Sequence, residues 1–298
     1  MKTVLLLGAT GNLGAMIGRE LLQRNAKLRV LVRPGSLPKL DPAIAARAEI
    51  VEDEAAAFQG VDTVVSSVQG GPETIVTAQL RWLAAAREAG VKRFIPSDFS
   101  FNFLRLAEGE NINSDWRREF ARQAKLAAGP VEVVHLMIGC FLDYGVLFGF
   151  LGAINLDKRE AYLWGDGEAK MQFTTYADTA AYTAEAALSS EPLPSSLQLA
   201  GDSLDFHELM QEVEAGVGFP LIVRVLGSLE DLDAAISNAQ AAQPANMYAW
   251  LPNMYWRGML SGKGGLTELH NDKFPTIRPT RVREYLQANP FAPTKAGA

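Results

Sequence analysis

The segment GATGNLG, residues 8–14, restricts the fold more than any other feature of the sequence. It follows directly on a short apolar run, Val4 to Leu7, and precedes a stretch with apolar residues at helical spacing. Glycine is needed where a chain turns sharply out of a strand, where its backbone approaches a pyrophosphate, and where strand and helix pack closely. The amides of Asn12 and Leu13 would then point at an anion from a helix N-terminus. This context favours a phosphate-binding loop over a simple glycine-rich turn.

The first 98 residues alternate between strands and helices. After the run at 4–7 we expect strands at 28–32, 48–51, 62–68 and 93–97, and helices over 15–25 and 72–89. Such alternation is typical of a parallel, doubly wound (Rossmann) α/β sheet with its ligand at the C-terminal edge of the strands. Residues 1–150 are predicted to form this dinucleotide-binding domain. Residues 151–298 are predicted to form mainly a smaller substrate-binding lobe, although a helix near 176–188 should rejoin the first domain.

Composition excludes several classes of function. The 298 residues contain 28 Lys and Arg against 34 Asp and Glu, a formal charge of −6, which argues against a nucleic-acid partner. Cys140 is the single cysteine, so an intrachain disulfide and a cysteine-based zinc site are excluded, and no other spacing suggests a metal. The apolar stretch 133–156 could span a bilayer, but His135, Asp143 and four glycines interrupt it. We therefore expect no membrane partner and a cytoplasmic protein.

The end of the second expected strand indicates which dinucleotide binds. NAD enzymes usually carry Asp or Glu there to bind the ribose 2′-hydroxyl. This chain instead reads VLVRPGSLPK, with Arg33 at that position and Ser36 and Lys39 in the following loop. Arginine can hold a phosphate through paired hydrogen bonds. The alternative is a solvated basic loop, but the pattern favours NADP(H).

The segment VKRFIPSDF, residues 91–99, makes a family resemblance specific. Together with GATGNLG, the helix that contains Gln79 and the LVR that ends at Arg33, it resembles the NmrA-like and isoflavone-reductase-like atypical short-chain dehydrogenases. The likeness resumes in GCFLDY, in WGDGEAKMQFTTYADTA and in the late segments LSGKGG and FPTIRPTRVREYL. It implies an NADPH-dependent oxidoreductase.

The resemblance also implies which residues bind the cofactor. The phosphate loop and the 2′-phosphate contact correspond to Gly8, Thr10, Gly11, Asn12, Leu13, Gly14 and Arg33. The ribose and adenine side corresponds to Ser66, Ser67 and Val68, the nicotinamide ribose to Pro96, Ser97 and Asp98, and an aromatic near the nicotinamide to Phe141. For Ser97 and Asp98 the alternative is hydrogen bonding within a turn, and for Phe141 it is core packing.

The chain departs from the family where the reductases carry a proton-handling lysine. The corresponding helix reads NSDWRREFARQAKLAAG, with Ser114 as a plausible N-cap, and Arg118 aligns with the lysine to within one residue. Arginine stays protonated, so it can anchor an anion or polarise an oxygen but is a poor general base. The catalytic candidates are therefore Arg118, Ser97 and Asp98. For Arg117 and Arg118 the alternative is that they lie on a solvated helix face. His135 is expected to be a sheet histidine whose hydrogen bonds are satisfied within the protein.

The later part of the chain supplies the second lobe. WGDGEAKMQFTT predicts a hairpin about Asp166 and Gly167, and TYAD and DFHE have the capping-box pattern of helix starts. An aromatic and methionine cluster follows, which we interpret as core packing or as one wall of a substrate pocket: Met247, Tyr248, Trp250, Met254, Tyr255 and Trp256.

The leading functional hypothesis is an NADPH-dependent reductase that delivers hydride to a small, aromatic or conjugated organic substrate. The alternative is a non-catalytic NADP(H)-binding redox sensor of the NmrA type, which the missing lysine favours. Epimerase or isomerase activity is a third hypothesis, because extended short-chain dehydrogenases share the phosphate loop. A small molecule is the expected partner, and a homodimer is left open.

Overall fold

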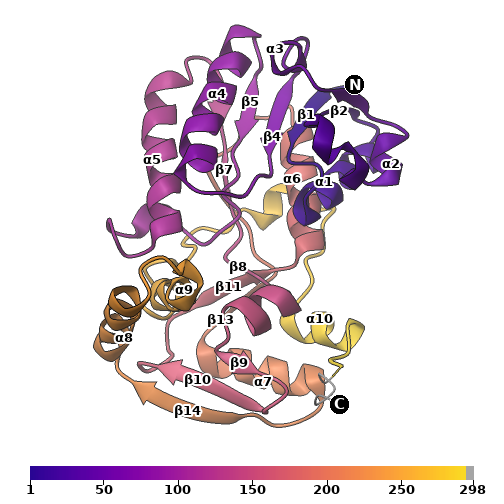
Figure 1. Ribbon diagram of the computed structural model, residues 1–298. Helices are drawn as coiled ribbons and strands as arrows, with labels where there is room; N and C mark the ends of the chain where they lie inside the picture. Colours follow the sequence, from indigo (N-terminus) through magenta and orange to yellow (C-terminus); the bar gives the residue numbers. More distant parts are fainter. Residues whose placement is uncertain (293–298) are drawn as a thin grey trace.

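The computed structural model describes residues 1–292 and has two lobes (Figure 1). The first lobe contains a six-stranded sheet whose neighbouring strands are all parallel, in the order β3-β2-β1-β4-β5-β6. The strands are β1 (Thr3–Leu7), β2 (Lys27–Leu31), β3 (Glu49–Val51), β4 (Thr63–Ser66), β5 (Arg93–Ile95) and β6 (Glu132–Val133). This is the doubly wound α/β fold that the sequence predicts.

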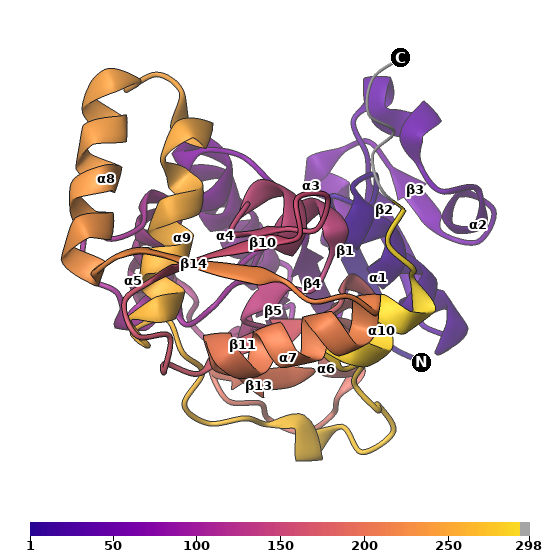
Figure 2. The same ribbon diagram turned by 90° about the horizontal axis from the view of Figure 1, so that it is seen from below.

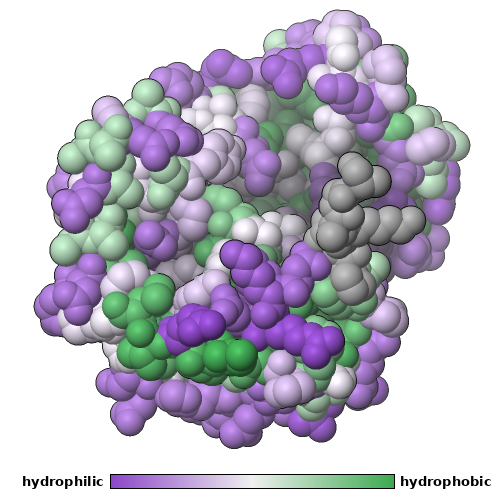
Figure 3. Space-filling view, turned by 60° about the horizontal axis from the view of Figure 1, so that its bottom comes forward, coloured by the Kyte–Doolittle hydropathy of each residue, from purple (hydrophilic) through white to green (hydrophobic). Residues whose placement is uncertain are grey.

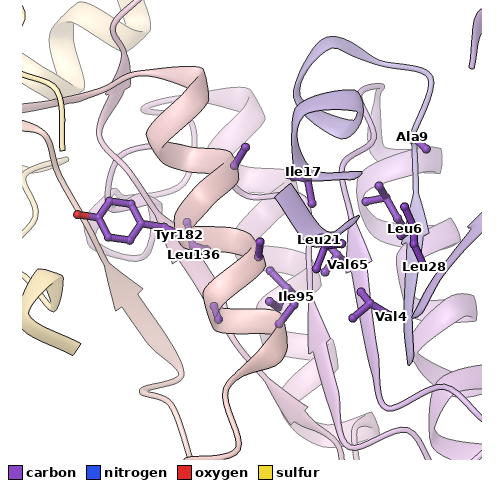
Figure 4. Close-up of a cluster of buried hydrophobic side chains, with 14 of the residues drawn as sticks. Val4, Leu6, Ala9, Ile17, Leu21, Leu28, Val65, Ile95, Leu136 and Tyr182 are labelled. Atoms are coloured by element: carbon purple, nitrogen blue, oxygen red, sulfur yellow. The ribbon is translucent and has the colours of Figure 1, made fainter. Parts of the chain in front are cut away.

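Helices cover both faces of this sheet. On one face lie α1 (Asn12–Gln23) and α6 (Tyr176–Leu188), and on the other lie α4 (Gln79–Glu88) and α5 (Ile112–Ala127). Strand β1 shows why both faces must be covered, because its successive apolar side chains point to opposite faces of the sheet. Val4 and Leu6 join the cluster with α1 and α6, parts of which are seen in Figure 4, and Leu5 and Leu7 join the cluster with α4 and α5.

Shorter elements complete the first lobe. A 3₁₀ turn at Pro34–Lys39 and the short helices α2 (Pro42–Ala45) and α3 (Glu54–Ala57) fill the connections beside β2 and β3. A π-helical stretch, Glu73–Ala78, leads into α4, and a 3₁₀ turn, Phe103–Arg105, precedes α5.

The chain passes into the second lobe through two short parallel strands. β7 (His135–Met137) pairs with β12 (Ser196–Gln198), so a segment sixty residues later returns beside it. The second lobe then has two small sheets. One is β13 (Asp202–Leu204), β11 (Met171–Thr174) and β8 (Cys140–Phe141), and the other is β14 (Ile222–Gly227), β10 (Glu160–Trp164) and β9 (Ile154–Asn155).

The predicted hairpin about Asp166 and Gly167 is wrong, because β10 and β11 belong to different sheets. β10 pairs in parallel with β14, whereas every residue of β11 is buried and needs neighbours on both edges, which β8 and β13 supply. The backbone of Gly167 accepts a hydrogen bond from Phe206 and that of Gly165 donates one to Gly227, so the connecting loop is tied to two later elements.

The remaining helices lie in the second lobe and are capped largely as expected. They are α7 (Phe206–Val217), α8 (Leu229–Ala242), α9 (Leu251–Leu260) and α10 (Val282–Ala288), with a π-helical stretch at Tyr144–Phe150 and 3₁₀ turns at Met247–Ala249 and Asn271–Lys273. Asp205 and Glu208 form the expected capping box of α7. Figure 2 shows α7 beside α10 and α8 beside α9.

The aromatic and methionine cluster packs mainly into the core of this lobe. Trp250 and Met254 are buried against α8, and Trp256 is buried in the main core of this lobe, where its indole N–H donates to the Leu151 carbonyl. Tyr248 is 72% exposed. Core packing is therefore the interpretation that the structure supports.

The outer strand β14 has an exposed apolar edge. Ile222, Val223, Val225 and Leu226 are all exposed, and Figure 3 shows apolar side chains gathered near the part of the molecule where Figure 1 places β14. Within residues 1–292, no helix combines the length and the apolar character that crossing a bilayer requires.

Candidate functional site

A cavity of about 710 Å³ opens at the C-terminal edge of the six-stranded sheet. The loops that follow β1, β2, β4 and β5 line it, and α5, β8 and the start of α6 close it. Of the residues that the sequence singled out, those in its lining are Gly8, Thr10, Gly11, Asn12, Leu13, Arg33, Ser36, Ser67, Val68, Ser97, Asp98 and Phe141. The topology brings these residues together because the carboxyl ends of parallel strands meet at one edge.

The three glycines of the first loop differ in what surrounds them. A Cβ on Gly8, whose φ is +82°, would lie 2.3 Å from the Ser67 carbonyl oxygen, and one on Gly14 would lie 2.1 Å from the Gly8 oxygen. A Cβ on Gly11 would meet only the Gly8 oxygen, at 3.5 Å. Gly8 and Gly14 are thus required by the protein's own packing. The space above Gly11 is left open toward the cavity, which fits the approach of a pyrophosphate.

The first turn of α1 is suited to bind an anion. Gly11 is its N-cap and supplies no side-chain acceptor for the first N–H groups, and no acidic residue lies in this turn. Unsatisfied N–H groups and the positive end of the helix dipole favour a negative charge at this place.

Arg33 lies at the rim of the cavity, where β2 gives way to the 3₁₀ turn. Its side chain is exposed and makes no hydrogen bond or ion pair with any residue of the described chain. Ser36 also lines the cavity, beside Arg33. Lys39 is exposed at the end of the same turn and lies outside the lining.

Ser97, which follows β5, is held by hydrogen bonds to the loop after β4 and to α4. Its hydroxyl donates to the Val68 carbonyl at 2.7 Å, and its backbone N–H donates to the buried Gln79 side chain at 2.8 Å. The hydroxyl is therefore engaged with the protein. Ser66 and Pro96 are both buried and are not part of the lining.

Asp98 forms a buried pair with His135. Asp98 Oδ2 and His135 Nδ1 are 2.7 Å apart, and the Asp98 side chain has no exposed surface. Oδ1 has no hydrogen-bond partner among the described residues. His135 lies in β7 and is satisfied by this contact, as expected for a sheet histidine.

Arg117 and Arg118, which are neighbours in α5, point to different places. Arg118 donates to the Leu106 carbonyl and pairs with Asp115, away from the cavity lining. Arg117 lines the cavity, and its Nε donates to the Asp98 carbonyl oxygen at 3.0 Å. Successive residues on a helix are rotated by about 100°, so Arg117 lines the cavity while the predicted candidate Arg118 does not.

The N-cap of α5 is Asn111 and not Ser114. The Asn111 side chain accepts a hydrogen bond from the Ser114 N–H at 3.0 Å. Ser114 is thus the third residue of the helix, so the prediction for it was wrong. The sequence offers both residue types as caps, and only the backbone conformation distinguishes them.

Tyr176, which the sequence analysis did not single out, stacks on Phe141 at the other side of the cavity. Their ring centroids are 4.1 Å apart with an interplanar angle of 12°. Burial raises the pKa of the Tyr176 hydroxyl, and the nearby Asp143 carboxylate raises it further. Tyr176 is the first residue of α6, so the TYAD capping pattern placed it correctly on a helix but could not place it in a site.

Other lining residues had no signal in the sequence. Arg81 and Trp82 come from α4 and Thr74 from the π-helical stretch, and the Trp82 indole N–H has no partner in the described part of the chain. Glu54 also lines the cavity and forms a two-bond pair with Arg81.

Comparisons with known proteins agree with this architecture. The model of the NmrA-like family matches residues 1–110. Pinoresinol reductase 2 of Arabidopsis thaliana is 28% identical, over 95% of this chain and 96% of its own length. An NmrA-like family domain-containing oxidoreductase of Gibberella moniliformis is 26% identical, over 80% and 84%.

Solved structures extend the likeness to the whole fold. A structure of AtPrR2 with NADP+ and (+)pinoresinol superposes with a TM-score of 0.79 and 25% identity, over 96% of this chain and 98% of that one. A crystal structure of isoflavone reductase gives 0.80 and 21% identity, over 96% and 99%. The chain is therefore similar to the NmrA-like family over residues 1–110 and to pinoresinol reductase 2 over nearly its whole length, and it shares the fold of these reductase structures.

Proposed function

We propose that the protein is an NADPH-dependent reductase that delivers hydride to a small aromatic or conjugated organic substrate. The observation that carries this proposal is one cavity that joins an uncapped helix N-terminus and a free arginine to an aromatic pair. The names of the relatives support it, since pinoresinol reductase 2 and the AtPrR2 complex with NADP+ and pinoresinol are similar over nearly the whole chain.

The loop residues and Arg33 would hold the cofactor. The open face of Gly11 and the N–H groups of Asn12 and Leu13 fit its pyrophosphate, with Gly8, Thr10 and Gly14 shaping the turn. NADPH would supply the hydride. Arg33 has no partner to give up among residues 1–292, so its guanidinium is available for a 2′-phosphate.

The remaining predicted contacts stay proposals and fall into two groups. Ser67 and Val68 lie in the lining, as do Ser97, Asp98 and Phe141 at the β5 side, where the nicotinamide would lie. Ser66 and Pro96 would act through these neighbours, and Lys39 only through a longer-range charge.

At the substrate end the chain offers fixed polar groups and an aromatic wall. Phe141 and Tyr176 present stacked rings, which suit an aromatic or conjugated compound. Arg117 supplies a permanent cation that can stabilise developing negative charge but cannot act as a base at neutral pH. Ser97 and Asp98 are held by other groups, so we assign them to shaping the site.

Cofactor binding and turnover test the proposal separately. Calorimetry with NADPH and NADH should show tighter binding of NADPH. Loss of NADPH absorbance should then be followed with pinoresinol, cinnamaldehyde and 1,4-naphthoquinone as substrates. Tight NADPH binding without oxidation by any of them would favour a sensor, and absence of NADPH binding would overturn the assignment altogether.

A homodimer is also proposed, and sedimentation equilibrium measures it.

A further inference from the structure

The Tyr176 hydroxyl is free in a place where a tyrosine usually has a partner. The side chain is half-buried and lines the cavity, yet its hydroxyl makes no hydrogen bond with any residue of 1–292. Other tyrosine hydroxyls do have protein partners, namely those of Tyr144, Tyr162, Tyr182 and Tyr255. A partly buried phenol normally finds a hydrogen-bond partner, so a free one in a cavity indicates a ligand atom.

The ring of Tyr176 is held in position before any ligand arrives. It stacks on Phe141 at 4.1 Å, and it begins α6, whose N-cap Thr175 accepts a hydrogen bond from the Asp178 N–H. Little side-chain freedom then remains to be lost when a ligand binds.

Arg117 brings a second unsatisfied donor to the same cavity from the opposite side of the sheet. Its Nε donates to the Asp98 carbonyl at 3.0 Å and its Nη1 to the Asn113 carbonyl at 2.9 Å. Within the described residues no carboxylate forms an ion pair with Arg117, and Nη2 has no protein acceptor. Two neutral carbonyls therefore fix a guanidinium whose charge is not neutralised.

We propose that Tyr176 and Arg117 together form a binding site for a substrate oxygen that becomes negatively charged during reduction. This inference rests on the proposed reductase function and narrows its substrate class. It points to compounds in which the carbon that accepts hydride is conjugated to an oxygen, such as aromatic enones, quinones or quinone methides, with the ring against Phe141.

The chemistry balances without a base on the protein. The hydride forms the new C–H bond at the far end of the conjugated system, and the displaced π pair moves to the oxygen. The Tyr176 O–H and the Arg117 N–H donate to that oxygen, and water later protonates the product. NADPH is oxidised to NADP+ and the substrate is reduced by two electrons. Because the pKa of Tyr176 is raised by burial, its hydroxyl stays protonated and available as a donor near neutral pH.

The test uses 4-nitrophenol as a probe, because its phenolate resembles the proposed anionic oxygen and absorbs visible light. It is titrated into the protein in complex with NADP+, and the pH at which the bound probe ionises is measured. The wild-type complex should bind the phenolate more tightly than the phenol, which lowers the pKa of the bound probe. Tyr176→Phe keeps the stacked ring but should weaken phenolate binding by about tenfold. Arg117→Gln should weaken it at least as much.

Tyr162→Phe is the matched control, because it deletes a hydroxyl that binds Glu160 on β10, outside the cavity. It should leave probe binding unchanged. NADP+ affinity is measured for every variant and should stay within about twofold of wild type. Phenolate binding that is equal in wild type and Tyr176→Phe, or absent in the wild-type complex, overturns the inference alone. Failure of the wild-type protein to bind NADP+ overturns the proposed function, and the inference with it.

Discussion

Residues of the same type have different surroundings, and therefore different roles, around this cavity. Gly8 has a left-handed φ of +82° and lies against the Ser67 carbonyl, whereas Gly11 has ordinary backbone angles and open space above it. Arg33 has no hydrogen-bond or ion-pair partner in the described part of the chain, while Arg118 is bound to Leu106 and Asp115. These differences come from the surroundings of each residue and decide what a substitution will do.

Arg33→Ala should remove most of the preference for NADPH. A charged hydrogen-bonded pair with the 2′-phosphate contributes on the order of 1.5–3 kcal/mol, which corresponds to at least about tenfold in affinity. NADH affinity should stay unchanged, because NADH has no 2′-phosphate. Calorimetry with both cofactors measures the two values. Equal affinities of the wild-type protein for NADPH and NADH would contradict the assignment of Arg33.

Substitutions of the two loop glycines should separate folding from binding. Gly11→Val should leave the thermal unfolding midpoint close to wild type and abolish NADPH binding, because the new side chain occupies the open space above the loop. Gly8→Ala should instead lower the midpoint, since its Cβ would lie 2.3 Å from the Ser67 oxygen at a strained φ. Thermal scans and fluorescence titration measure both. A folded Gly11→Val variant that still binds NADPH with micromolar affinity would place the phosphate loop elsewhere.

At the scale of elements, α5 shows how a helix start sets a site. Asn111 caps the helix and so fixes which of its residues face the sheet edge. With this start, Arg117 faces the cavity and Arg118 faces the loop at Leu106. A rotation of the helix by one residue, about 100°, would turn Arg118 toward the cavity and Arg117 away from it.

Arg117→Ala and Arg118→Ala form a matched pair on this helix. Once a substrate is found, Arg117→Ala should lose on the order of tenfold to a thousandfold in kcat, because a fixed cation near the developing charge is removed. Arg118→Ala should keep its kcat near wild type and lose some stability, since it breaks contacts with Leu106 and Asp115. The opposite ranking of the two kcat values would return the site role to Arg118.

The cap itself can be measured through stability. Asn111→Ala should lower the free energy of unfolding by about 1 kcal/mol, since the Ser114 N–H would lose its acceptor inside the protein. Ser114→Ala should lower it by less, because Ser114 lies within the helix. Urea denaturation of both variants decides between them, and a larger loss for Ser114→Ala would show that the cap is misassigned.

At the scale of the whole molecule, one buried arginine connects the strands to a later segment. Arg93, on β5, pairs with Glu132 and donates to the carbonyls of Ala186, Ser189 and Glu191. It thereby holds the C-terminal end of α6 against the sheet. Since α6 begins with Tyr176, this contact also bears on the position of the aromatic pair.

Arg93→Met should reduce the free energy of unfolding by on the order of 3 kcal/mol. Methionine can fill the space of the stem, but Glu132 and three carbonyls would each lose one of their donors in a mostly buried place, although Ser189 keeps Lys2 and Glu132 keeps the Leu193 N–H. Urea denaturation measures the loss. Arg81→Met is the control, because Arg81 makes an exposed pair with Glu54 and should change stability by less than about 1 kcal/mol. Similar losses for both variants would contradict the assigned importance of Arg93.

Much of the fold follows from local pattern. The alternation of apolar runs with helical spacing locates five of the six strands of the first sheet and its main helices, because burial on both faces needs continuous apolar runs. Asp166 and Gly167 are residue types that are common in tight turns, so the local sequence suggested that the two flanking strands pair. That prediction was wrong. Only the pairing partners β8, β13 and β14, distant along the chain, show that the two flanking strands separate.

By itself the sequence determined the doubly wound sheet, the glycine-rich loop after β1 and the presence of Arg33 after β2. These depend on residues that are close in the chain, where spacing fixes geometry. The tertiary structure alone decided that Arg117 and not Arg118 faces the cavity, that Asp98 is held by His135, and that Tyr176 stacks on Phe141. Those contacts join residues from separate elements, so they depend on helix rotation and strand pairing that no local pattern specifies.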